Sequence, residues 1–228
     1  GINAEYGETQ IYQNQIIQRA KLMEQATEKI IYVQLPQKAV ELQKAISNEK
    51  VLSNQFILDL QTQLNDLIIF KNDLMEFDCT VQNLTPVHKS IYQLEEYIKI
   101  HVKELLQIIE PIKSWITIAE ADEEQLENLT KISQSLDNIS ELCKQLMQRI
   151  LQFHTTRGRL LFKLQKRKLF DIAKVLIQYD IGQTTEIQNG FAELYNQLIM
   201  SYDNTIKNYN QFKKSEGNNR NQSIDIMY

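Results

Sequence analysis

The chain has 228 residues, 43% of them hydrophobic, which is enough for one large domain or two small ones with a well-buried core. Its six glycines and three prolines are far below ordinary usage and indicate long helices with few turns. The net charge of -4, from 25 basic and 29 acidic residues, gives no overall attraction to phosphate backbones, so we expect no nucleic-acid partner.

The first predicted helix runs from Gln10 to Ile46, where apolar residues recur every three or four positions on one face. Pro36 is expected to bend or break this helix, because proline lacks an N–H and its ring clashes with the preceding turn. The segment 47–85 has weaker helical spacing and ends just before a second proline. We predict that 47–85 is a connection containing some helix.

The second predicted helix begins at Thr85, a good N-cap residue, with Pro86 at the first helical position. An apolar stripe then continues as far as Trp115. Pro111 is expected to kink the helix near its end.

Two further helices are predicted after an acidic break. The apolar pattern fails over 119–128, where four of the ten residues are glutamate. A third helix is expected from Leu129 to about Lys163, and the sequence TTRG at 155–158 is its expected interruption. A fourth helix is expected from roughly Lys168 to Lys214.

These four long amphipathic helices predict an all-α fold, an antiparallel four-helix bundle that forms a single domain over residues 1–228. Gly182 and Gly190 inside the last helix each cost about 1 kcal/mol relative to alanine, which indicates close packing or a local irregularity. Alternating helix directions place the connection between helices two and three at the same end as the chain terminus. One surface should therefore present both the acidic loop 119–128 and the tail 215–228.

Motifs for catalysis or metal binding are absent from the sequence. The histidines His88, His101 and His154 do not stand at helical metal-site spacing from carboxylates and from one another, and no phosphate-binding or nucleophile-elbow motif occurs. We therefore predict no cofactor, no metal and no enzymatic activity. His101 lies on the apolar stripe and is interpreted as a hydrogen-bonded structural residue. An enzyme built into the bundle would need a polar pocket that the sequence does not indicate.

The two cysteines, Cys79 and Cys143, lie far apart without CxxC spacing and without a signal peptide before them. They are interpreted as buried thiols in a reducing compartment, the cytoplasm and also the nucleus. Charged, Gln or Asn residues interrupt every apolar stretch before it could span a bilayer, so we expect a soluble protein with no membrane partner.

The two charged runs, EADEEQLE at 120–127 and KLQKRK at 163–168, each fit a solvated surface when taken alone. The terminus GNNRNQSIDIMY is more informative, because a polar stretch ends on the apolar residues Ile226, Met227 and Tyr228. A polar tail has no reason of its own to end this way. We therefore predict that the tip binds a partner.

Several short stretches match one family in order and spacing. These include the apolar run that ends at Trp115, and they continue to the terminal SIDIMY. Together they resemble the 11S proteasome activators, the PA28 or REG family of four-helix subunits that form heptameric rings. The other stretches are LPQKAVEL at 35–42, TTRG at 155–158, FAELYNQLI at 191–199 and FKKSEG at 212–217.

The resemblance implies a non-ATPase activator of the 20S proteasome. In this family seven C-terminal tails enter pockets of the α-ring, held mainly by the terminal carboxylate, and activation loops open the gate. Carried over to this chain, the docking tail ends on Ile226, Met227 and Tyr228. The activation loop would consist of Glu120, Ala121, Asp122, Glu123, Glu124, Gln125, Leu126, Glu127 and Asn128.

The predicted loop matches the family best at Asn128, because an alignment on Trp115 places Glu127 and Asn128 where the family has a pair of asparagines.

The chain departs from the family pattern in two places. The loop lacks the family's Pro-Arg entry and its glycines, so we expect a more acidic and more helical segment. The Lys/Glu-rich insert of mammalian members is missing from 47–85.

An alternative from a different class is a helical scaffold or coiled-coil tether that pairs its last helix with partner helices. That interpretation predicts a monomer or dimer with an irrelevant C-terminus, whereas the family resemblance predicts a homoheptamer.

Overall fold

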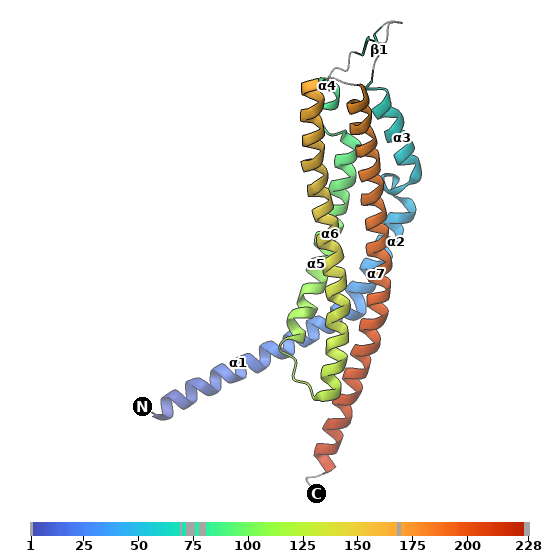
Figure 1. The fold of residues 1–228 in the computed structure, drawn as a ribbon. Coiled ribbons are helices and arrows are strands. Elements are labelled where there is room, and N and C mark those ends of the chain that lie inside the picture. Colours follow the sequence, from blue (N-terminus) through green and yellow to red (C-terminus); the bar gives the residue numbers. More distant parts are fainter. Residues whose placement is uncertain (1, 69, 72–75, 78–80, 168–169, 226–228) are drawn as a thin grey trace. The chain divides into compact units, whose positions relative to one another are not determined.

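The structure is a computed structural model that describes residues 2–68, 70–71, 76–77, 81–167 and 170–225, with side chains described over 10–68, 83–167 and 170–215 (Figure 1). Over these residues the fold is all-α apart from one short hairpin, and long helices pack as a bundle, as the sequence predicts. The helices are α1 (Ile2–Lys29), the π-helical turn η1 (Ile30–Gln34), α2 (Leu35–Asn48), the 3₁₀ turn η2 (Lys50–Leu52), α3 (Asn54–Asn65), α4 (Val81–Leu84), α5 (Lys89–Ile116), α6 (Glu123–Arg167) and α7 (Phe170–Asp225).

The hairpin is made by β1 (Phe70–Lys71) and β2 (Glu76–Phe77), which pair antiparallel with Phe70 opposite Phe77. It lies within the predicted connection 47–85, together with α3 and α4. The helical content predicted for this segment is therefore present. No helix of the described residues is both long and apolar enough to cross a membrane.

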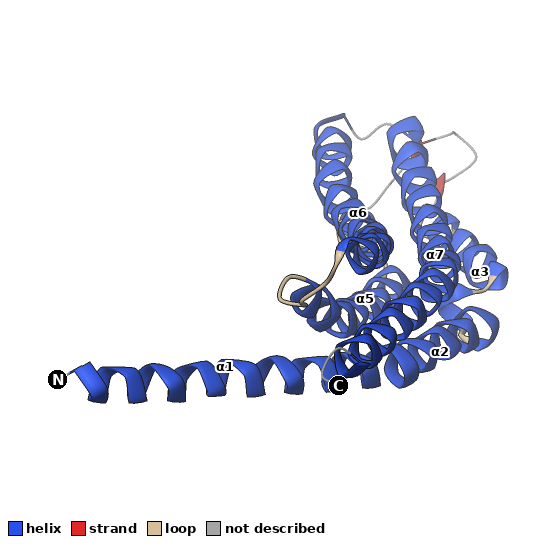
Figure 2. Ribbon diagram, turned by 90° about the horizontal axis from the view of Figure 1, so that it is seen from below, coloured by secondary structure: helices blue, strands red, loops and turns tan. Residues whose placement is uncertain are grey.

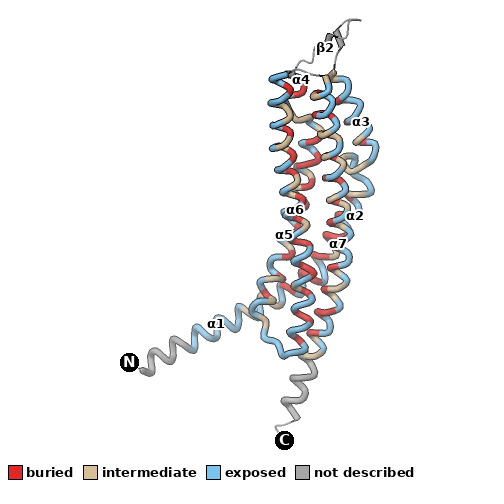
Figure 3. The backbone as a smooth tube through the Cα atoms, in the orientation of Figure 1, coloured by how far each residue is buried: buried red, intermediate tan, exposed pale blue. Residues whose placement is uncertain are grey.

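The described chain is organised in two compact units. Unit 1 takes in Gly1–Val40, Glu104–Ser140 and Gln197–Tyr228, and unit 2 takes in Glu41–Lys103 and Glu141–Asn196. The helices α2, α5, α6 and α7 each contribute residues to both units. Figure 3 shows buried positions recurring along each of these four helices, alternating with exposed ones.

Unit 2 has a core built from α3, α4, α5, α6 and α7. Phe153, which is fully buried, stacks on Tyr179 with ring centroids 5.8 Å apart. Gly190 marks close packing of α7, as predicted, because a Cβ atom there would lie 3.0 Å from the Leu146 side chain. The same test finds no neighbour within 4 Å of Gly182. The core cluster comprises Leu60, Leu64, Leu84, Ile91, Phe153, Leu164, Ala173, Leu176 and Ile177.

The irregularity expected at Pro36 appears one turn earlier, as η1, and helical backbone continues from α1 through η1 into α2. The N–H of Leu35 donates to the carbonyl of Ile30, five residues back. Because Pro36 has no N–H, the carbonyl of Tyr32 has no α-helical donor, and a wider π turn accommodates this. Pro111 likewise lies inside α5, which continues to Ile116.

The second predicted helix starts later than expected, at Lys89 rather than at Thr85. The carbonyls of Leu84, Thr85 and Pro86 accept hydrogen bonds of 2.9, 3.1 and 3.2 Å from the guanidinium of Arg157. They are therefore not available for a first helical turn. The helix is instead capped at His88, whose Nδ1 accepts the Ser90 N–H at 3.3 Å.

The interruption predicted at TTRG 155–158 does not occur, because α6 continues unbroken to Arg167. One glycine costs only about 1 kcal/mol in a helix, and Gly158 has no close neighbour to disturb it. Arg157 holds this stretch in place, since its Nε donates to both carboxylate oxygens of Asp180 at 3.0 and 3.1 Å. Packing against α7 thus outweighs a weak local preference for a turn.

Candidate functional site

The connection between α5 and α6 in unit 1 is a short loop, residues 117–122 (Figure 2). Its start is fixed by backbone bonds, because the N–H groups of Ile118 and Ala119 both donate to the carbonyl of Trp115 at 3.0 Å. The Thr117 hydroxyl donates to the Ser114 carbonyl at 2.7 Å. The loop therefore begins as a tight turn over the end of α5.

The end of the loop is fixed by a reciprocal cap. The N–H of Asp122 donates to the side-chain oxygen of Gln125 at 3.0 Å, and the N–H of Gln125 donates to the Asp122 carboxylate at 2.9 Å. This cap starts α6 at Glu123, although the sequence predicted a start at Leu129. The Asp-x-x-Gln spacing was the signal for it. Acidic residues in the first turn also suit the positive end of the helix dipole.

The predicted activation loop is consequently one third loop and two thirds helix. Glu120, Ala121 and Asp122 are in the loop, and the remaining residues form the first turns of α6. Two of those are buried, Gln125 and Asn128. The exposed members are Glu120, Ala121, Asp122, Glu123, Glu124, Leu126 and Glu127.

Asn128 is buried, although it belongs to an acidic stretch whose charged side chains are exposed. It is 5% exposed, and its side-chain amide donates to the Glu124 carbonyl one turn earlier at 3.2 Å. The neighbouring Glu127 is an exposed acid whose pKa is lowered by its hydrogen bond to Lys131, with the charges 2.7 Å apart. An acidic patch and a buried amide thus adjoin one another on α6.

A polar groove of about 400 Å³ lies between the start of α6 and the end of α7, both in unit 1. It brings residues of the predicted loop beside the first residue of the predicted tail, Ser215. The tip residues Ile226, Met227 and Tyr228 lie outside the described residues, and α7 extends to Asp225. The α6–α7 groove is lined by Glu124, Glu127, Asn128, Lys131, Gln211, Lys214 and Ser215.

Behind the loop lies an aromatic cluster that sequence analysis did not identify. Trp115 is 3% exposed and contacts Tyr209 and Phe212 of α7 edge-on, with ring centroids 5.7 and 5.5 Å apart. Tyr209 also meets Tyr32 at 5.8 Å. The spacing of Tyr209 and Phe212, one helical turn apart, was the available signal. The cluster joins the loop to the part of α7 that precedes the tail.

A second groove, of about 250 Å³, separates this cluster from α1. Its lining includes both apolar and charged residues, and the Glu24 carboxylate on its α1 side pairs with Lys213 of α7. We name it the α1 groove. Its lining consists of Ile17, Ala20, Lys21, Glu24, Trp115, Ile118, Ala119, Glu120 and Phe212.

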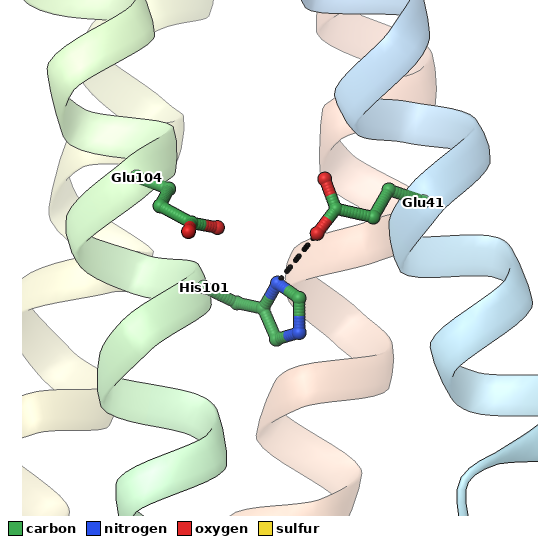
Figure 4. Close-up of side chains that lie close together, drawn as sticks. All are labelled: Glu41, His101 and Glu104. Atoms are coloured by element: carbon green, nitrogen blue, oxygen red, sulfur yellow. Dashed lines mark ion pairs between the residues drawn. The ribbon is translucent and has the colours of Figure 1, made fainter.

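The three histidines occupy structural positions in unit 2. Figure 4 shows His101 facing Glu41, with its Nδ1 3.3 Å from the carboxylate. His101 also meets the ring of Tyr97 at 4.6 Å. His154 Nε2 lies 2.9 Å from the carboxylate of Glu95. Burial lowers the pKa of His88, the residue that caps α5.

Of the two cysteines, Cys143 is a buried free thiol, as the sequence predicts. Burial raises its pKa to about 12, so the reactive thiolate does not form near neutral pH. Cys79 lies outside the described residues.

Unit 1 thus combines long packed helices with a capped loop at one helix connection and an adjoining C-terminal segment. The sequence model of the family described as proteasome activator PA28, C-terminal, matches residues 84–222. The chain therefore belongs to the PA28 family of proteasome activators. This confirms the resemblance found in the sequence and the prediction of a non-enzymatic protein.

Comparison with solved structures gives the same fold. The crystal structure of the 11S subunit of the Plasmodium falciparum proteasome, PA28, superposes with a TM-score of 0.67 at 20% sequence identity. The match covers 90% of this chain and 94% of that one. No curated protein matches the chain.

Proposed function

We propose that this chain is a non-ATPase activator of the 20S proteasome that acts as a homoheptameric ring in the cytoplasm and also in the nucleus. Its seven C-terminal tails, ending on Ile226, Met227 and Tyr228, dock into pockets of the α-ring. The residues 120–128 then contact the gate and open it, so that peptides reach the proteolytic chamber. Membership of the PA28 family supports the role as an activator.

The α6–α7 groove is the observation that carries the proposal. Asn128 and Glu127, from the predicted activation loop, line the same groove as Lys214 and Ser215 at the base of the predicted tail. A tail that docks from this place brings the loop against the same partner surface. Binding and gate contact therefore require one orientation of unit 1, with no further movement.

The tail and the loop have different roles in the proposed mechanism. A single tail offers only a short apolar tip and a carboxylate, and seven tails on one ring turn a weak contact into useful avidity because later insertions are intramolecular. The loop is short and held at both ends, at Trp115 and at the Asp122–Gln125 cap. A fixed loop pushes on a gate without paying for its own ordering.

Assembly into a ring is supported by apolar side chains of α1 that are exposed to solvent. The stripe that is buried at Ile30 and Ile31 continues toward the N-terminus as Tyr12 and Ile16, which are 63% and 68% exposed. Figure 2 shows α1 extending away from the other helices of unit 1. Exposed apolar surface that continues a packed face marks a protein interface, and a second copy is the partner that the family implies.

Two measurements test the proposal together. Mass photometry at micromolar concentration is expected to give about 190 kDa, seven times the 26.8 kDa chain. Purified 20S particles are then mixed with the protein and a fluorogenic peptide, and the rate of hydrolysis should rise with ring concentration to a plateau. A monomer or dimer, or a rate equal to that of 20S alone, would overturn the proposal.

A further inference from the structure

Trp115, the single tryptophan of the chain, has two roles at once. Its carbonyl accepts the N–H groups of Ile118 and Ala119, which start the 117–122 loop. Its indole is buried and makes T-shaped contacts with the rings of Tyr209 and Phe212. One residue therefore holds the loop backbone and attaches it to α7.

The loop has little freedom of its own. Its far end is held by the Asp122–Gln125 cap, and Thr117 is bonded back to Ser114 at its near end. What remains variable is the placement of the whole loop, and this depends on what the end of α5 packs against. On the α1 side lies the α1 groove, so the close aromatic contacts of Trp115 come from α7.

We propose that Trp115 is a positioning residue, which sets the loop at a fixed place relative to α7 through its contact with Phe212. Phe212 is three residues before Ser215, where the predicted tail begins. The cluster therefore ties the loop that contacts the gate to the helix that delivers the tail. The effect on gate opening rests on the function proposed above, whereas the positioning itself is a property of the isolated protein.

The experiment compares two buried aromatic residues of the same helix. Phe212→Leu removes the ring that meets Trp115, and Phe191→Leu removes a fully buried ring of unit 2 that meets Tyr97 and His101. Hydrogen exchange at the Ile118 and Ala119 amides reports the loop directly. We expect Phe212→Leu to speed exchange there by roughly fivefold to tenfold, the size expected from losing one aromatic pair, and Phe191→Leu to leave it unchanged.

Trp115→Phe is the second variant, used if Phe212→Leu fails to fold. It keeps an aromatic ring and the backbone carbonyl but shortens the reach to α7, so loop exchange should again accelerate. Unchanged exchange at both amides, or an equal acceleration in Phe191→Leu, would overturn the positioning role.

Proteasome assays on the same variants test the consequence. At saturating concentration, Phe212→Leu should dock with the affinity of the wild type but give a several-fold lower maximal rate, while Phe191→Leu behaves as the wild type. A loosened loop with full stimulation would overturn the link to gate opening. If the wild type itself does not stimulate the particle, the proposed function fails, and the exchange data still decide the positioning.

Discussion

The segment 84–88 of unit 2 leads into α5, and the loop 117–122 of unit 1 leads out of it, yet they are held by different means. The first is fixed by a buried charge, because Arg157 donates to the carbonyls of Leu84, Thr85 and Pro86. The second is fixed by its own backbone bonds and cap. Its acidic side chains consequently stay exposed.

This difference separates the effects of substitution. Around Arg157 the polar groups are paired with one another inside the protein, so substitutions there should lower its stability. Around the loop the polar groups line an open groove, so changes there should cost function while the fold persists. Each prediction below tests one side of that division.

The largest expected effect is on docking. Deletion of Ile226, Met227 and Tyr228 should abolish binding to the 20S particle and leave ring mass and melting temperature unchanged. The polar segment before the tip cannot bury enough apolar surface to belong to the core. Binding is measured by pull-down, and melting by circular dichroism.

Extension of the chain by a few residues after Tyr228 is the companion variant, since it keeps every side chain and moves only the carboxylate. It should weaken docking in the same way. A deleted protein that still stimulates hydrolysis to the wild-type level would contradict the role of the tip.

The largest expected loss of stability is at Arg157. Arg157→Met should lower the free energy of unfolding by about 3–5 kcal/mol, because it leaves the buried Asp180 carboxyl without its partner. The matched control is Arg149→Met, which breaks a 3.2 Å pair with Glu186 between half-exposed side chains and should cost at most about 1 kcal/mol. Urea unfolding measures both. Equal losses would contradict the comparison.

The same pair predicts a pH dependence. Burial raises the pKa of Asp180 from 3.8 to about 6 despite the nearby Arg157. The native state then keeps a proton that the unfolded state has lost between about pH 4 and 6. The contribution of this carboxyl is therefore fully present below about pH 4 and is lost as the pH rises to about 6.

Asp180→Asn removes this titration while keeping the shape. Between pH 4 and 7 the wild type should lose up to ~3 kcal/mol of stability relative to the variant, about two pKa units at 1.36 kcal/mol each. Urea unfolding at several pH values measures the difference between the two proteins. A difference that does not change with pH would show that the carboxyl titrates equally in both states.

The same division explains what the sequence could predict. Periodicity depends on many residues at once, so the long helices and the burial of Ile98, Leu136 and Leu198 could be predicted from it. The start of α6 depends on one local pair, Asp122 and Gln125. Their spacing is typical of a helix cap, but the acidic residues around it are also typical of a loop. The aromatic cluster behind the loop joins α5 to α7, and it could be identified only once the packing of these helices was known.

The TTRG segment could not be interpreted correctly from the sequence alone. Locally, a glycine after two threonines favours a turn. The outcome was decided by Arg157, whose partners Asp180 and Leu84 are distant in sequence. The sequence around TTRG does not indicate that Arg157 is buried. A long-range contact of this kind therefore becomes visible only when the helices are packed.

The smallest expected effect, and the most specific to unit 1, is at Asn128. Asn128→Tyr should leave docking unchanged and lower the maximal stimulation of peptide hydrolysis several-fold, roughly 1 kcal/mol on the gate equilibrium. A tyrosine cannot fit where a 5% exposed amide is bonded to the helix backbone, so its ring must enter the α6–α7 groove and alter the face offered to the gate. Asn138→Tyr, at an exposed position on the same helix, is the matched control and should change neither quantity. Docking affinity and hydrolysis at saturation are measured for both variants. If Asn128→Tyr activates as well as Asn138→Tyr, the first turns of α6 take no part in gate opening, and the function of unit 1 reduces to its tail.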